Sequence, residues 1–101
     1  MTLLCLVSLN DAPPVVWPAD DVSQATGMLG GAVRLATLND DVTRLAVDLV
    51  EDGPNGWEPW RSPDGRAIGG LLGDWLRSED RALWLAYRRK SGAIVQYEAL
   101  A

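Results

Sequence analysis

The chain has 101 residues, 48% hydrophobic and 23% charged, which is typical of a single globular domain over residues 1–101 rather than a disordered chain. Its net charge of −5 disfavours binding to nucleic acid and to anionic membranes. The same charge favours binding to a protein partner with a basic surface. It contains no histidine, so Ser-His and Cys-His nucleophile pairs and imidazole metal ligands are excluded.

The first apolar run, "TLLCLVSL", predicts a strand near residues 2–9 that is covered on both faces. It contains Cys5, the only cysteine, which cannot form an internal disulfide. A lone thiol fits a reducing compartment, so we expect a cytoplasmic protein and an inert, buried Cys5. No run approaches the roughly 18 apolar residues of a membrane span, and we expect no membrane association.

Prolines surround the next apolar segment, so Val15–Trp17 can form only a short edge strand. A helix is predicted near residues 20–29, where an aspartate can cap its first turn and apolar residues recur at helical spacing. Gly30 and Gly31 are expected to end this helix. Residues 32–38 alternate between apolar and other side chains, and therefore predict a second strand.

Residues 42–50 fit two patterns. A helical stripe and a strand alternation can both be traced through "VTRLAVDLV". Four of these nine residues are β-branched valine or threonine, which favours a strand that pairs with residues 32–38. The helix remains the alternative.

The clearest helical stripe predicts a helix near residues 64–77, with Ser62-Pro63-Asp64 as its start. Gly69 and Gly73 lie inside it, although each glycine costs roughly 1 kcal/mol of helix propensity relative to alanine. We therefore expect both glycines to allow a close approach to a neighbouring helix or sheet.

Residues 82–89 and 93–100 both alternate and flank "KSG", which predicts a terminal β-hairpin. The elements together predict an α+β fold, in which an antiparallel sheet of four to five strands has two helices packed on one face.

No catalytic residue, metal ligand or cofactor site is predicted. The paired acids, such as Asp20-Asp21 and Asp40-Asp41, stand at element ends, where helix capping and solvation explain them. The spacing of the acids in "EDGPNGWE" does not match a calcium loop. We therefore expect a protein that is not an enzyme.

The stretch "GPNGWEPWRSPDG" places two of the five tryptophans among prolines and glycines. In one interpretation, the rings of Trp57 and Trp60 fold back and close an end of the core. In the other, at least one ring, preferably that of Trp57, stays exposed on a stiff loop and contacts a partner, with Glu58 and Arg61 as a polar rim.

The segment "VSQATGMLGGAVRLATLNDDVTRLAVDLVEDG" resembles an uncharacterised family of small phage and bacterial proteins. Those proteins carry a helix that ends in a Gly-Gly pair, then a hairpin and a polar turn. Leu29, Gly30, Gly31 and the residues after them carry the resemblance, which implies an α+β fold and an origin in a mobile element, and no activity.

These observations favour a non-enzymatic protein-binding module, such as a phage-encoded or immunity-type inhibitor or regulator of a host protein. The predicted partner-binding residues are Trp57, Glu58, Trp60 and Arg61, and homodimerisation stays open. The alternative is a small intracellular ligand-binding or minor enzymatic domain that uses the Trp57/Trp60 loop as a lid or wall.

Overall fold

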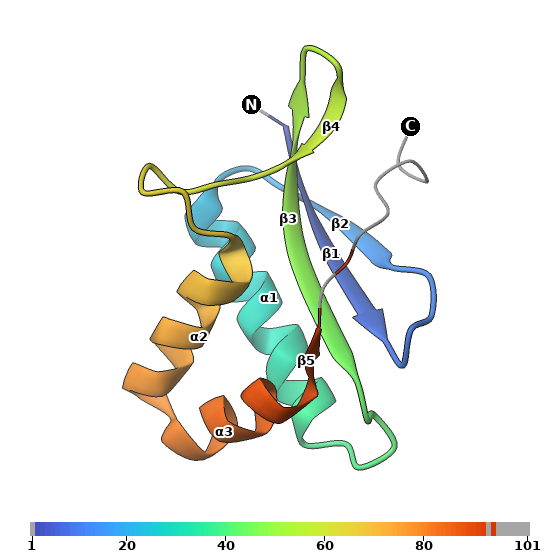
Figure 1. The fold of residues 1–101 in the computed structure, drawn as a ribbon, viewed down its shortest axis with the longest axis vertical. Helices are drawn as coiled ribbons and strands as arrows, with labels where there is room; N and C mark the ends of the chain where they lie inside the picture. Colours follow the sequence, from blue (N-terminus) through green and yellow to red (C-terminus); the bar gives the residue numbers. More distant parts are fainter. Residues whose placement is uncertain (1, 93, 95–101) are drawn as a thin grey trace.

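The computed structural model describes residues 2–92 and 94 of the chain. Its fold is α+β, with an open sheet on one side and three helices on the other (Figure 1). The strands are β1 (Leu3–Leu9), β2 (Val15–Ala19), β3 (Leu45–Gly53), β4 (Gly56–Pro59) and β5 (Ser91–Gly92), and the helices are α1 (Val22–Thr37), α2 (Ile68–Glu79) and α3 (Arg81–Lys90).

The sheet has the order β2-β1-β3-β4, with every neighbouring pair antiparallel, and the short β5 runs parallel to β3. The predicted strands at residues 2–9 and 42–50 and the edge segment at Val15–Trp17 are thus confirmed. β1 and β3 form the centre of the sheet because their alternate residues on the helix side are apolar. These residues lie in the core: Leu3, Cys5 and Val7 on β1, and Leu45, Val47 and Leu49 on β3.

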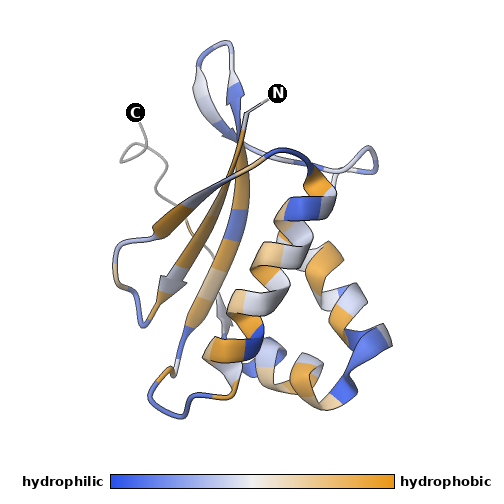
Figure 2. Ribbon diagram, turned by 180° about the vertical axis from the view of Figure 1, so that it is seen from behind, coloured by the Kyte–Doolittle hydropathy of each residue, from blue (hydrophilic) through white to orange (hydrophobic). Residues whose placement is uncertain are grey.

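Helix α1 continues through Gly30 and Gly31 to Thr37. The predicted helix end at these glycines, the strand at residues 32–38 and its pairing with residues 42–50 were therefore wrong. Neither glycine has a positive φ. The helix continues along the sheet (Figure 2) because its buried stripe continues: Ala25, Leu29, Val33 and Ala36 all belong to the core. Burial of the stripe beyond the glycines outweighs their low helix propensity.

The C-terminal end of α1 is held by the only lysine of the chain, Lys90 at the end of α3. Its Nζ donates to the carbonyl oxygens of Ala36, Thr37 and Asn39 at 3.4, 3.1 and 3.0 Å. These contacts satisfy carbonyl groups at the helix end and place a positive charge at the negative end of the helix dipole.

Helix α2 begins at Ile68 rather than near residue 64. The predicted start forms a separate turn, in which the Ser62 hydroxyl donates to the Asp64 carboxylate and accepts from the Arg66 amide at 3.0 Å. Gly65 has a φ of +85°, outside the helical region, so the chain cannot enter the helix there.

Residues 82–89 belong to α3, so the predicted strand there was wrong, and the described residues form three helices rather than the expected two. The Asp80 carboxylate accepts from the Leu83 amide at 3.1 Å and caps the helix. Leu83 and Tyr87, four residues apart, share the buried face. The strand expected at 93–100 lies outside the described residues, apart from residue 94.

The glycines of α2 allow close contact with α3, as the sequence predicted. The Tyr87 hydroxyl donates to the Gly69 carbonyl at 3.2 Å. A Cβ atom at Gly73 would lie 3.7 Å from the Tyr87 ring and 3.9 Å from the Trp84 ring. There is room for a methyl group at Gly73 but not for a large side chain.

We expect Gly31→Ala to raise the free energy of unfolding by about 1 kcal/mol, because no atom lies within 4 Å of the added methyl group and alanine has the higher helix propensity. Gly73→Leu, in contrast, should lower it by roughly 1–3 kcal/mol through overpacking against α3. Urea denaturation measures both changes. A loss of stability in Gly31→Ala would mean that α1 does end at the glycine pair.

We expect Lys90→Met to lower the free energy of unfolding by about 1–2 kcal/mol, because three carbonyl contacts at the end of α1 are lost. Arg89→Met is the matched control, since it removes the same charge from an exposed residue one position earlier. Thermal and urea unfolding of the two variants provide the comparison. Equal stabilities would contradict a capping role for Lys90.

Candidate functional site

The tryptophan stretch contains a β-hairpin. Strands β3 and β4 are joined by Pro54 and Asn55, and Gly56 takes a φ of +109° as the chain re-enters the sheet. In the antiparallel register, Asp52 faces Trp57 and Glu51 faces Glu58. The prolines and glycines therefore do not prevent strand pairing here: they form its turn and its edge.

The two tryptophan rings lie on opposite sides of the sheet. Trp57 pairs with Asp52. Asp52 points away from the helices, because Leu49 and Glu51 belong to the row of β3 that faces the helices and successive residues of a strand alternate between the two faces. Trp60 continues β4, and its amide donates to the Leu49 carbonyl at 2.8 Å. An odd spacing reverses the side, so the Trp60 ring lies in the core at 9% exposure while Trp57 is half-buried.

Of the other two predicted contact residues, Glu58 lies on the side of the sheet opposite to Trp57. The Glu58 carboxylate lies over Gly53 on the helix side of the hairpin. Its Cδ is 2.6 Å from the position that a Cβ atom would take at Gly53. Arg61 is exposed beyond the end of β4. The role of Trp57, Glu58, Trp60 and Arg61 in partner binding stays a prediction, and the geometry gives them no common face.

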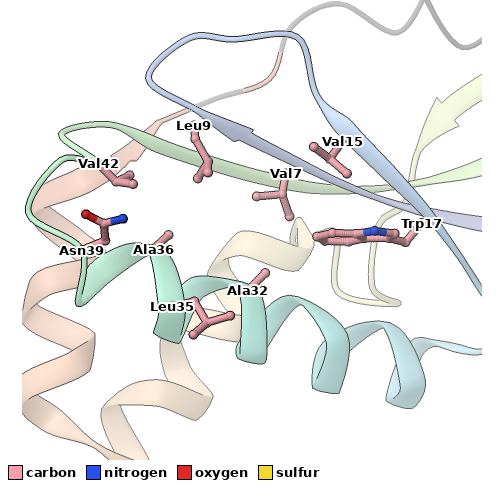
Figure 3. Close-up of a pocket in the computed structure, with 9 residues that line it drawn as sticks. All are labelled: Val7, Leu9, Val15, Trp17, Ala32, Leu35, Ala36, Asn39 and Val42. Carbon is pink, nitrogen blue, oxygen red and sulfur yellow. The ribbon is translucent and has the colours of Figure 1, made fainter.

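A more extensive apolar feature lies at the opposite edge of the sheet. A groove of about 280 Å³ runs between α1 and the hairpin of β1 and β2 (Figure 3). Its lining is apolar apart from one asparagine: Val7, Leu9, Val15, Trp17, Ala32, Leu35, Ala36, Asn39 and Val42.

The groove adjoins a shallow hollow of about 360 Å³ on the outer side of α1. Trp17, Ala32 and Leu35 line both. Gly27 and Gly31 form the floor of the hollow, and no atom lies within 4 Å of the position of a Cβ atom at either glycine. The absence of two side chains, one helical turn apart, therefore leaves space that another molecule can enter.

Large apolar side chains stand at the rim of the groove. Leu35, which lines the groove, is 76% exposed, and Leu38, which directly follows the last residue of α1, is 72% exposed. Val15 and Leu9 are exposed on the facing hairpin. Single exposed leucines are normal, but a continuous apolar patch beside a groove is typical of an interaction site. We name this groove, its hollow and Leu38 the α1 groove.

Charge is unevenly distributed, and the α1 groove lies in the acidic part. Residues 1–60 contain nine of the 14 acidic side chains and only two of the nine basic ones. Asp20 and Asp21 stand just before α1, three and four residues after the lining residue Trp17, and Asp40 and Asp41 lie in the sequence between the lining residues Asn39 and Val42. Within residues 2–92 and 94, none of these four carboxylates forms an ion pair.

The two basic residues of this region are already paired with acids. Arg34 lies 3.6 Å from Asp80 on the side of the other helices, and Arg44 lies 3.2 Å from Asp11. At the C-terminal end of α1, the Lys90 ammonium beside Asn39 offsets part of the charge of Asp40 and Asp41, so a smaller net negative charge remains there, while Asp20 and Asp21 keep theirs.

The described residues contain no cluster of three or more histidine, cysteine or acidic side chains that could hold a metal ion. None of their helices has the length and apolar character needed to cross a membrane. Cys5 is fully buried, its thiol points to the Ala25 carbonyl at 4.0 Å, and burial raises its pKa. A thiolate nucleophile is disfavoured at such a position.

No family model, curated protein or solved structure matches the chain. The surface of the molecule is what remains to indicate a function.

Sequence reasoning missed the α1 groove because it assigned residues 32–38 to a strand. On a strand, Leu35 has no fixed relation to Gly27 and Gly31. On a helix, the three residues recur at a spacing of four and share one exposed face. The sequence signal that could have revealed the site is the repeat of Gly27, Gly31 and Leu35 at intervals of four residues, in which two glycines are followed by a leucine.

We expect Trp60→Ala to lower the free energy of unfolding by about 3–5 kcal/mol, because it removes a large buried ring from the core. Trp57→Ala should cost no more than about 1 kcal/mol, the scale of a cross-strand pair. Chemical denaturation of both variants tests this difference. A larger loss in Trp57→Ala than in Trp60→Ala would contradict the assignment of the rings to the two sides.

Proposed function

We propose that the protein is a non-enzymatic binding module whose α1 groove receives apolar side chains of a partner protein. The observation that carries this proposal is the exposure of Leu35 and Leu38 beside an apolar groove. The two leucines and the rim of the β1–β2 hairpin expose apolar surface to water. Burial of this surface by a partner would be favourable through the hydrophobic effect.

A protein partner fits this surface better than a small ligand. Ligand pockets enclose roughly 300–1,000 Å³ and carry several converging polar groups. The groove has about 280 Å³, and Asn39 is its one polar lining residue. It thus has little to orient a ligand, whereas the apolar area continues outward over α1, as a protein interface requires.

The biological role that fits such a module is inhibition or regulation of another protein inside the cell. A small, acidic, motif-free domain is typical of phage-encoded and immunity-type regulators, and a buried lone thiol suits a reducing cytoplasm. Trp57 is a second candidate contact on the far side of the sheet, with Glu58 and Arg61 nearby in sequence.

Capture of partners from a lysate of the native host tests the proposal. The wild-type protein should retain a stoichiometric protein partner, and Leu35→Glu should weaken its binding at least thirtyfold, the effect of losing an interface hot spot of about 2 kcal/mol. Leu85→Glu is the matched control, since Leu85 is 43% exposed on α3 outside the groove. Thermal unfolding of the wild type, Leu35→Glu and Leu85→Glu is the folding control, and we expect equal melting temperatures for the three proteins.

Other outcomes identify the alternatives. If Trp57→Ala loses the partner and Leu35→Glu keeps it, the partner binds at β4 rather than at the α1 groove. The absence of any protein partner, together with a rise in melting temperature on adding a metabolite, would favour the ligand-binding domain instead.

A further inference from the structure

We propose that the occupant of the α1 groove is an amphipathic α-helix of the partner protein with basic residues at both ends. This inference rests on the proposed function and adds the chemistry of the partner. Three features of the site carry it: the shape of the groove, the composition of strand β2 and the position of the acidic residues.

The shape of the site suits a rod with side chains on one face. The groove runs along α1, and Leu35 stands at its side (Figure 3). The hollow continues along the same helix, where Gly27, Gly31 and Leu35 recur every four residues, about one helical turn. Ridges on one helix pack between such rows on another. Because the two glycines present no side chain, a bulky apolar residue of the partner can reach the α1 backbone beside Trp17, and Leu35 packs against the next turn.

An added strand is the other common way to bind beside a sheet edge, and β2 is poorly built for it. This edge strand has five residues and contains Pro18, which has no amide hydrogen to donate, and Pro13 and Pro14 precede it. Short, proline-containing edges resist pairing with another strand. The apolar side chains of β2 that face α1 are therefore available to side chains of a partner rather than to its backbone.

Charge determines what flanks the apolar face of the partner helix. Asp20 and Asp21 precede α1, and Asp40 and Asp41 follow it. The 16 residues of α1 span about 24 Å at 1.5 Å per residue. Lysine or arginine residues roughly four turns apart on a bound helix would meet both acidic ends at once. Acids at these positions would instead be repelled by a protein that already carries a charge of −5.

A synthetic peptide can test this inference while the partner itself is unidentified. The probe is an 18-residue helix-forming peptide with leucines at i, i+3, i+4, i+7 and i+11 and two lysines at each end. One control peptide carries glutamates in place of the lysines. Another keeps the composition of the probe but distributes the leucines around the helix. Fluorescence anisotropy at low and at physiological salt measures binding to the whole protein.

The lysine-ended peptide should bind at least tenfold more tightly than either control peptide, and its affinity should fall as salt is raised. The variant Asp20→Asn/Asp40→Asn/Asp41→Asn should lose about tenfold in affinity; Asp21 is kept because its carboxylate caps α1. Glu51→Gln/Asp52→Asn/Glu79→Gln removes the same charge away from the groove and should bind like the wild type. Leu35→Glu should abolish binding.

Equal binding of the lysine- and glutamate-ended peptides, equal binding of the redistributed peptide, or no binding of any peptide would overturn this inference. If partner capture still depends on Leu35 in any of these cases, the proposed function stands and only the chemistry of the partner is wrong. If capture does not depend on Leu35, the proposed function fails as well. A wild-type protein that sediments as a dimer, with Leu35→Glu as a monomer, would assign the groove to a second copy of this chain.

Discussion

The structure depends on one contact above all others, the burial of the α1 stripe against the centre of the sheet. Leu29 and Val33 have no exposed surface, and they belong to the same core as the helix-facing residues of β1 and β3. Figure 2 shows α1 running along the sheet. Cys5 and Leu49, among the helix-facing residues, have no exposed surface, and α1 contacts both strands. The register of the sheet is fixed by the same contact, since a shift of one residue would turn every apolar side chain away from the helix.

The position of the other two helices explains why α1 also has a bare side. Trp75 of α2 packs against Gly30, Asp80 pairs with Arg34, and Lys90 holds the last turn. All of these contacts lie on one flank of α1. The flank that faces β2 has no helix beside it within the described part of the chain, and the apolar residues of both elements remain at its surface as the α1 groove.

The tryptophans of the β3–β4 hairpin show how strand alternation separates neighbouring residues. Two residues that are three positions apart on an extended chain lie on opposite sides of a sheet. Trp57 and Trp60 therefore cannot contact the same partner surface together. Trp60 is part of the core cluster at 9% exposure, which gives its ring a structural role. The two interpretations drawn from the sequence thus separate by residue: the core accounts for Trp60, and only Trp57 keeps a surface on which a partner could bind.

The sequence by itself determined the α+β class, strand β1 and the weak edge at β2, and it favoured strand β3 over a helix because β-branched residues are frequent in residues 42–50. Only the tertiary structure decided that α1 runs through Gly30 and Gly31 and that residues 81–90 form a helix. The two glycines cost α1 roughly 2 kcal/mol in propensity, and burial of Val33 and Ala36 beyond them more than offsets that cost. Local patterns thus stop being decisive where burial outweighs propensity. The bare side of α1 depends on where α2 and α3 pack, and no local pattern in the chain encodes that.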